Sequence, residues 1–235
     1  KAIIVAGGGP FPGNNLWDAT QMCANFAYRT LKYQGFSKND IHYLSSNMTL
    51  DLDGNGEADD VDALATNANL EQALTQWAPA RANALPTGDV VVYLVDHGGN
   101  GVFRMGAFET LAVSDFSQWL NTMQSGILGK AVVIYDACES GSFLPGLTPP
   151  PEYAAQRVLI ASTEAGAPAH FVTQGSVSFS NLFWTHVFNG ADVENAFTAS
   201  SQSLNLSVGQ TPLLEADGDG APNQPGDYAL VRNTY

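Results

Sequence analysis

Two segments of the sequence place a reactive side chain directly after an apolar run. Cys138 follows VVIYDA, and His97 follows DVVVYLVD. A thiolate attacks a carbonyl carbon well, and a nearby imidazole can give or take the proton that such a reaction needs. The backbone N–H groups of Gly98 and Cys138 are candidates for holding the negative oxygen that then forms. Together the residues predict a catalytic cysteine and histidine, whereas either one alone is typical of a buried thiol or a hydrogen-bonded turn.

The elements that must position these side chains are visible as short apolar runs. Runs without alternation are typical of strands that are covered on both faces. Strands are expected at residues 2–7, 89–96, 130–137 and 157–162, with a weaker one at 40–45 and an edge strand at 227–231. Helical patterns separate them at 17–34, about 68–80, 114–125 and about 178–206. This alternation predicts a single α/β domain over residues 1–235, built on a mostly parallel sheet.

The topology expected for these strands brings the two reactive side chains together. In open parallel sheets, ligands bind beyond the carboxyl ends of the strands. His97 and Cys138 follow the ends of two predicted strands, and the chain between them has room for one crossover with a helix. A right-handed crossover of that size places its strands adjacent or one apart. We therefore expect both side chains at one edge of the sheet.

Composition limits what the chain can bind. Of its 235 residues 45% are hydrophobic, and 23 acidic against 9 basic residues give a formal net charge of −14. Nucleic acid is an unfavourable partner, because phosphate binding needs clustered lysine and arginine. No apolar run approaches the roughly 20 residues that span a bilayer. Cys23, the second cysteine, lies in a helical pattern and is expected to be a small buried hydrophobic residue.

The two reactive segments resemble those of a known family. VDHGGNG (95–101) and DACESGSF (136–143) are similar to the histidine and cysteine blocks of the legumain (asparaginyl endopeptidase) family, which shares a clan with the caspases. IIVAGG near the start and QGFSKNDI (34–41) occur in the order of that family, so the match extends over residues 2–188. The resemblance implies a caspase-like three-layer α/β/α sandwich with a mostly parallel central sheet.

The resemblance also implies roles for the reactive residues. Cys138 corresponds to the nucleophile, His97 to the general acid and base, and Gly98 with the Cys138 amide to the oxyanion hole. Water that resolves the thioester makes the enzyme an endopeptidase, and the resemblance also permits an amine to do so, which is a ligase activity. By analogy with an asparagine in the family, Asn14 or Asn15 is expected to orient His97.

Substrate choice is where the sequence departs from the family pattern. Legumains hold a P1 Asn or Asp with an Arg-His pair at the start of the first helix and an acid two residues before the cysteine. Asp136 supplies the acid, but NNLWDAT (14–20) has neither arginine nor histidine. The alternatives are the Asn/Asp preference of the family and a basic P1 residue held by Asp18 and Asp136. Asp18 is equally a candidate helix N-cap, and Glu139 and Ser140 are further candidates for substrate contact.

Two acidic segments have the pattern of calcium loops. DLDGNGEADDVD (51–62) matches the twelve-residue EF-hand loop, which predicts a structural Ca²⁺ ion. Its candidate ligands are Asp51, Asp53, Asn55, Glu57 through its carbonyl, and Asp62. ADGDGAPN (216–223) is a poorer match, with Asp217 and Asp219 as candidate ligands, and an acidic surface loop is the alternative in both places. The HxxxH and CxxC spacings of zinc sites are missing from the sequence, so no catalytic metal is expected.

The sequence as a whole predicts a cysteine endopeptidase that acts on peptide or protein substrates, in an extracellular or cell-surface location. The competing interpretation is a catalytically silent, calcium-stabilised binding or adhesion module on the same fold. The intact His97, Cys138 and flanking glycines favour the enzyme. The sequence does not determine the oligomeric state.

Overall fold

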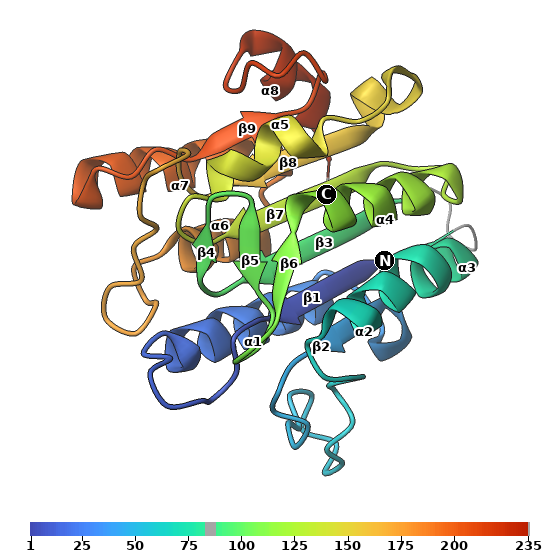
Figure 1. The fold of residues 1–235 in the computed structure, drawn as a ribbon, viewed down its shortest axis with the longest axis vertical. Coiled ribbons are helices and arrows are strands. Elements are labelled where there is room, and N and C mark those ends of the chain that lie inside the picture. Colours follow the sequence, from blue (N-terminus) through green and yellow to red (C-terminus); the bar gives the residue numbers. More distant parts are fainter. Residues whose placement is uncertain (83–87, 235) are drawn as a thin grey trace.

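The computed structural model of the chain describes residues 1–82 and 88–234. In this part of the chain, a central sheet has six strands in the order β2-β1-β3-β7-β8-β9 (Figure 1). They are β1 (Ala2–Ala6), β2 (Ile41–Leu44), β3 (Val90–Val95), β7 (Ala131–Asp136), β8 (Arg157–Ala161) and β9 (Leu213–Glu215). Neighbouring strands are parallel except for β9, which runs antiparallel to β8. The five parallel strands confirm the sequence prediction to within two residues at each end.

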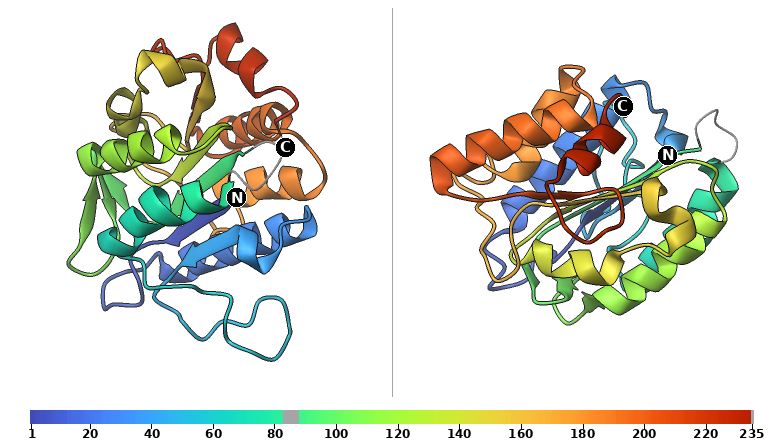
Figure 2. Two further views of the ribbon diagram at one scale, coloured as in Figure 1. Left: turned by 90° about the vertical axis from the view of Figure 1, so that its right-hand side faces the viewer. Right: turned by 90° about the horizontal axis from the view of Figure 1, so that it is seen from above.

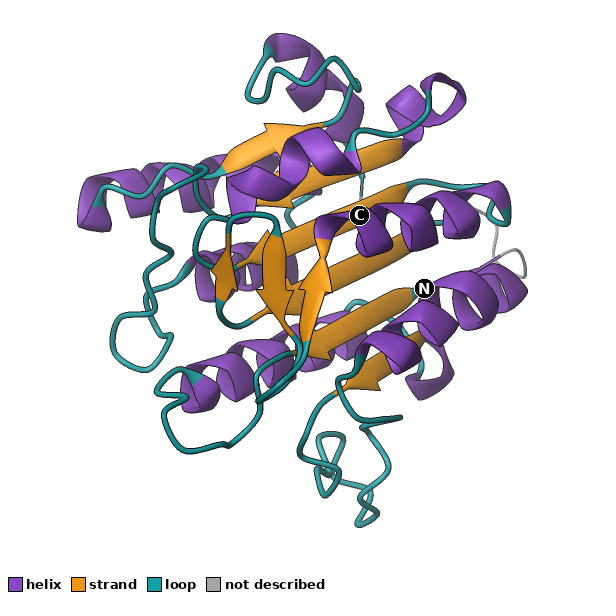
Figure 3. Ribbon diagram, viewed as in Figure 1, coloured by secondary structure: helices purple, strands orange, loops and turns teal. Residues whose placement is uncertain are grey.

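Helices cover both faces of this sheet (Figure 2). One face packs against α1 (Trp17–Tyr33), α6 (Phe179–Phe188) and α7 (Val193–Val208). The other packs against α4 (Val113–Ser125), α5 (Leu144–Leu147) and a helical run of α2 (Asn67–Gln72), η2 (Ala73–Trp77) and α3 (Ala78–Ala82). Because both faces are buried, the strands are apolar throughout rather than alternating. The predicted three-layer arrangement is confirmed, and Figure 3 shows helices in front of the strands and behind them.

The remaining helical elements are short. They are η1 (Lys38–Asp40), η3 (Ser140–Phe143), η4 (Pro151–Gln156) and α8 (Pro225–Val231). Among the described residues, no helix combines the length and the apolar character needed to cross a bilayer.

A small antiparallel sheet follows His97 directly. It consists of β4 (Gly98–Gly99), β5 (Val102–Arg104) and β6 (Thr110–Ala112). The Gly8 N–H donates to the Arg104 carbonyl over 3.1 Å, and a Cβ atom at Gly7 would lie 2.3 Å from that same oxygen. The small sheet is thus held tightly against the end of β1. The sequence did not predict it, because strands of two or three residues carry no periodicity.

One sequence prediction about the C-terminal third was wrong. Residues 227–231 are not an edge strand but belong to α8, which begins with Pro225 at a position that suits its fixed φ angle. The Asp227 carboxylate accepts the Gln224 N–H over 2.9 Å and caps this helix. The helical region predicted at about 178–206 is confirmed and consists of two helices, with a turn between them at Gly190, whose φ is +87°.

The sheet has a short strand at each side, β2 and β9. Each of these edge strands leads into an acidic loop: β2 into the segment 51–60, and β9 into the segment 215–227. Figure 1 shows the two loops at opposite ends of the molecule. The reactive residues lie between them, in the middle of the strand order.

Candidate active site

His97 and Cys138 follow the ends of two directly paired strands. β3 and β7 are parallel, with Val95 opposite Asp136, and each reactive residue comes two positions later. Both side chains are half-buried. A Cβ atom at Gly98 would lie 2.5 Å from the Cys138 carbonyl oxygen, so the two strand ends are in close contact. The adjacency expected from the topology is therefore present, and glycine is the residue that permits it.

Asn14, in the loop between β1 and α1, fixes the orientation of the His97 ring. Its Nδ2 donates to the Gly9 carbonyl over 2.9 Å, and its Oδ1 accepts the Leu16 N–H over 3.0 Å. His97 Nε2 lies 3.1 Å from the same Oδ1. The Asn14 Oδ1 atom can only accept hydrogen bonds, so the His97 nitrogen that faces it, Nε2, must carry the ring proton. The other ring nitrogen, Nδ1, is then available to take up and release a proton. Of the two asparagines considered from the sequence, the structure selects Asn14.

The residues after Cys138 fold back beneath it. Cys138 Sγ lies 3.9 Å from the Ala169 carbonyl oxygen, and the Glu139 N–H donates to the Ala167 carbonyl over 2.8 Å. Glu139 is half-buried and has a φ of 57°, the left-handed conformation that non-glycine residues adopt only in special turns. This sharp turn exposes part of the cysteine at the end of the strand.

Ser140, a candidate for substrate contact from the sequence, is inaccessible to solvent in the structure. It is fully buried, and its Oγ accepts the Thr163 N–H over 3.1 Å. The same hydroxyl lies 3.3 Å from the Ser162 Oγ. Its function is structural, because it joins the end of β7 to the loop after β8.

Asp136 is a fully buried carboxylate two residues before the cysteine. Its Oδ2 accepts hydrogen bonds from the Ser180 N–H and Oγ, over 2.9 Å and 2.6 Å. Its Oδ1 accepts no hydrogen bond of good geometry from the described residues, but the Ser162 hydroxyl lies close enough to favour the charged form of the carboxyl. Burial raises the pKa of this carboxyl above its usual range. A buried carboxylate with a free oxygen is complementary to a cation or to a hydrogen-bond donor.

The structure does not bring Asp18 into a closed pocket with Asp136. Asp18 lies in the first turn of α1 and is exposed, whereas Asp136 is inaccessible to solvent. Nor is Asp18 the N-cap, a position that Leu16 occupies without a side-chain hydrogen bond. Its negative charge in the first turn still suits the helix dipole.

A cavity of about 410 Å³ opens beside His97 and Gly98. Phe11 and Arg104 line it, and the Arg104 guanidinium lies 5.6 Å from the centre of the Phe11 ring. Arg104 also donates to the Ala107 carbonyl over 3.3 Å, and the ion pairs among the described residues do not include it. Sequence reasoning missed Arg104, because only the β4–β5 hairpin brings it next to the histidine.

Cys23 is chemically distinct from Cys138. Its side chain is fully buried beside Ser178, and both cysteines are free thiols. Burial, together with the negative charge of Asp136, raises the pKa of the Cys23 thiol to about 12. The expectation of a buried, unreactive residue is confirmed.

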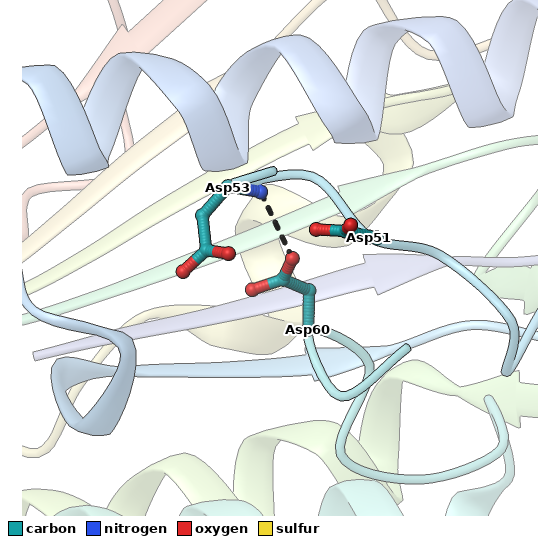
Figure 4. Close-up of side chains that lie close together, drawn as sticks. All are labelled: Asp51, Asp53 and Asp60. Carbon is teal, nitrogen blue, oxygen red and sulfur yellow. Dashed lines mark hydrogen bonds between the residues drawn. The ribbon is translucent and has the colours of Figure 1, made fainter. Parts of the chain in front are cut away.

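The first acidic loop groups three carboxylates, of which two, Asp51 and Asp53, are named by the EF-hand pattern and the third, Asp60, is not. Oxygen atoms of Asp51, Asp53 and Asp60 lie within 4.8 Å of one another, and Asp60 accepts the Asp53 N–H over 3.1 Å (Figure 4). Asp62 lies outside this group. Its carboxylate accepts the Tyr43 N–H over 2.8 Å and pairs with Lys38 over 3.0 Å.

The other candidate ligands of the acidic loops have local hydrogen bonds. Asn55 Oδ1 accepts the Glu57 N–H over 2.7 Å, and both residues are exposed. In the second loop, Asp217 lies with Glu215 and Asp227 rather than with Asp219. Asp219 is exposed, and its Oδ1 accepts the Ala221 N–H over 2.7 Å.

Comparison with protein families gives a match for the segment that carries both reactive residues. Residues 81–167 match the Peptidase C13 family. In this segment the chain is similar to the C13 cysteine peptidases. It is 36% identical over 80 residues to the vacuolar-processing enzyme of Vicia sativa, and 38% identical over 78 residues to vacuolar-processing enzyme beta-isozyme 1 of Oryza sativa subsp. indica. The resemblance to the legumain family is thus confirmed for the histidine and cysteine blocks.

The C13-like segment is a limited part of these relatives. The matches cover 34% and 33% of this chain, and 16% of the length of each relative. The fold is caspase-like over almost the whole chain. The crystal structure of caspase-1 from Spodoptera frugiperda superposes with a TM-score of 0.65, covering 92% of this chain and 85% of the caspase, at 14% sequence identity.

Proposed function

We propose that the chain is a cysteine endopeptidase in which Cys138 is the nucleophile and His97 is the general acid and base. The observation that supports this most directly is the parallel pairing of β3 and β7, which delivers the two side chains to one edge of the sheet. The match of residues 81–167 to the C13 peptidases supports the same reaction class.

The proposed reaction has two steps. His97 Nδ1 takes the thiol proton as the Cys138 sulfur forms a bond to the scissile carbonyl carbon, and it gives that proton to the departing amine as the C–N bond breaks. The N–H groups of Gly98 and Cys138 are proposed to bind the oxyanion between these events. Water, deprotonated by His97, then attacks the thioester and releases the acid and the free thiol. An amine in place of water gives a new peptide bond, which is the ligase side activity.

For the P1 position we propose a basic residue. Asp136 is fully buried two residues before the cysteine, and its Oδ1 accepts no hydrogen bond of good geometry from the described residues, although the Ser162 hydroxyl lies close to the carboxyl. A lysine or arginine side chain would supply the missing donors and the opposite charge. Asp18 is exposed and shares no closed pocket with the fully buried Asp136, so the proposal depends on Asp136 alone. The Asn/Asp preference of the family is the alternative outcome of a P1 scan.

The cavity beside His97 is proposed to hold the part of the substrate that leaves with the amine. His97 must reach the departing nitrogen, so the chain on that side continues past the ring toward Phe11 and Arg104. The Arg104 guanidinium favours a carboxylate there, because charge-assisted hydrogen bonds to arginine are strong.

We also propose that the first acidic loop binds a structural Ca²⁺ ion through Asp51, Asp53 and Asp60. Their grouped oxygens are the hard ligands that calcium prefers. An extracellular or cell-surface location, where calcium is abundant, fits this proposal.

A thiol-directed peptide probe tests the enzyme against the silent binding module. We expect labelling of the wild-type chain and of Cys23→Ala, and its loss in Cys138→Ala and His97→Ala, with kcat/KM reduced at least about 10³-fold. A library varied at P1 then gives the preferred residue. Folded protein that neither cleaves the library nor takes up the probe would leave the binding module as the function.

A further inference from the structure

The segment that follows edge strand β9 gathers three carboxylates from different elements. Glu215 ends β9, Asp217 lies in the loop, and Asp227 belongs to α8. Each places one oxygen within 4.8 Å of the others. Glu215 is only 2% exposed and Asp227 is fully buried. Like charges removed from water cost free energy unless something neutralises them.

The hydrogen bonds of these residues leave one buried oxygen unused. Asp227 accepts the Ala216 N–H over 2.7 Å with Oδ1 and the Gln224 N–H over 2.9 Å with Oδ2. Glu215 Oε1 accepts the Gly218 N–H over 2.7 Å. In contrast, Glu215 Oε2 is buried and accepts no hydrogen bond from the described residues.

No positive side chain neutralises the group. The ion pairs formed by the described residues join Lys1 to Asp40, Lys32 to Asp53, Lys38 to Asp62 and Arg232 to Glu194. None of them includes Glu215, Asp217 or Asp227. Three neighbouring carboxylates, one with a buried free oxygen, therefore lack a counter-charge in the described part of the protein.

We infer that Glu215, Asp217 and Asp227 bind one Ca²⁺ ion. Calcium holds oxygen ligands at about 2.3 to 2.6 Å, so any two ligands of one ion are at most about 5 Å apart, and the three side chains meet this limit. Oxygen-only ligands disfavour zinc. Mg²⁺ is disfavoured because it keeps several waters, whereas Glu215 and Asp227 are shielded from solvent.

This ligand set differs from the one that the sequence pattern names. The pattern selects Asp217 and Asp219, whose spacing is that of a calcium loop, but Asp219 is exposed and outside the group. Glu215 and Asp227 come from the strand before the loop and the helix after it. One ion therefore joins β9, its loop and α8, and stabilises the C-terminal side of the sheet.

The test measures calcium binding to the whole chain. Asp51→Asn is used as the background, because it disables the first acidic loop. By isothermal titration calorimetry we expect this variant to bind one Ca²⁺ ion, and a hundredfold excess over Kd to raise its Tm by about 5 to 10 °C. Adding Glu215→Gln should abolish both the heat and the Tm shift, while raising or preserving the Tm in chelator, because a buried charge is removed.

The matched control is Glu71→Gln, which removes one exposed carboxylate from α2 on the far side of the molecule and should leave binding unchanged. The inference is overturned if the Asp51→Asn chain binds no calcium, or if Glu215→Gln binds it as tightly. Should Glu215→Gln fail to fold, Asp217→Asn replaces it. Hydrogen exchange gives a local readout: calcium should slow exchange in residues 213–231 of the Asp51→Asn chain, and unchanged rates there also overturn the inference.

Discussion

His97 and Cys138 occupy the same level of two neighbouring parallel strands. The strands are paired in register, with Val95 opposite Asp136, and the reactive residues follow two positions later on each strand. The backbone hydrogen bonds of the sheet therefore set their relative height, independently of the loops around them. A rigid element thus supplies the orientation that catalysis by proximity requires.

Replacing Asn14 with alanine should impair turnover while leaving substrate binding intact. The asparagine holds the proton on His97 Nε2, so its loss frees the ring to rotate and to change tautomer. We expect kcat to fall about 10- to 100-fold with KM nearly unchanged. Asn15→Ala, at the exposed neighbouring position, should keep the wild-type kcat. A rise in KM alone would mean that Asn14 contacts substrate rather than positions the histidine.

Asp136→Asn should weaken cleavage after a basic residue and spare the fold. The amide can still accept the Ser180 hydrogen bonds but lacks the charge that would pair with lysine or arginine. We expect kcat/KM for a P1 Arg peptide to fall at least about 30-fold, or about 2 kcal/mol. Because burial raises the pKa of Asp136, its charged form is disfavoured in the folded state, and the variant should be at least as stable near pH 7. Equal cleavage after arginine by both proteins would exclude the basic P1 pocket.

Arg104→Ala should remove a preference for acidic residues on the leaving side of the scissile bond. Peptides with Asp just after the cleaved bond should lose about 10-fold in kcat/KM, and the matched Asn peptides should change little. Arg104→Lys should retain part of the preference, because lysine keeps the charge but not the planar fork. If both peptides respond alike to Arg104→Ala, the residue supports the hairpin and not the substrate.

Asp51→Asn and Asp62→Asn should differ in their response to calcium. The EF-hand pattern treats both as ligands, but only Asp51 lies with Asp53 and Asp60, while Asp62 is occupied by Tyr43 and Lys38. Differential scanning calorimetry with calcium and with chelator should show a smaller calcium-dependent rise in Tm for Asp51→Asn than for the wild type. Asp62→Asn should lower both melting temperatures and keep their difference. The reverse pattern would restore Asp62 as the ligand.

Asp192→Asn should reduce stability at neutral pH but not in strong acid. Burial opposes ionisation of Asp192, yet hydrogen bonds from the N–H groups of Asn195 and Asn233 outweigh it and lower the pKa of this carboxyl. The carboxylate therefore stabilises the fold above the unfolded-state pKa of about 3.9, and this contribution is lost as the pH falls through the lower folded-state value.

Urea unfolding at several pH values checks this expectation. At pH 6 the variant should lose about 1 to 2 kcal/mol of unfolding free energy, because asparagine still caps the helix through Asn195 but has an NH2 group where Oδ2 accepts the Asn233 N–H. The difference from the wild type should shrink as the pH falls below the unfolded-state pKa of about 3.9 and through the lower folded-state pKa of Asp192. Asp115→Asn, in the exposed first turn of α4, should show a much smaller difference throughout.

The parts of the fold that the sequence predicted are those with a single, strong physical cause. Strands covered on both faces must be apolar at every position, which made β1, β3, β7 and β8 visible. The segment DYALV at 227–231 was wrongly predicted to be a strand, because its short apolar pattern is compatible with a strand and with a helix. Pro225 and the capping carboxylate of Asp227 favour the helix.

Site residues could be predicted from the sequence where they directly follow a strand, but not where their position depends on the path of a loop. His97 and Cys138 needed only the order of the strands. Arg104 reaches the histidine through a hairpin that has no periodicity. Asp60, rather than Asp62, lies with Asp51 and Asp53, and the Asp62 carboxylate is held by Tyr43 and Lys38. Ser140 follows the cysteine in the sequence, but the left-handed turn at Glu139 directs it inward.

The two outermost strands of the sheet, β2 and β9, both run into acidic loops, and this placement has a consequence for behaviour in solution. If each loop binds a calcium ion, removing calcium should destabilise the edge strands β2 and β9 at the same time. The central strands β3 and β7 should stay paired. Once the edge strands have detached, the strands next to them expose unpaired backbone N–H and C=O groups that can pair with other copies of the chain. Chelated protein should therefore self-associate at a temperature where its central strands are still intact.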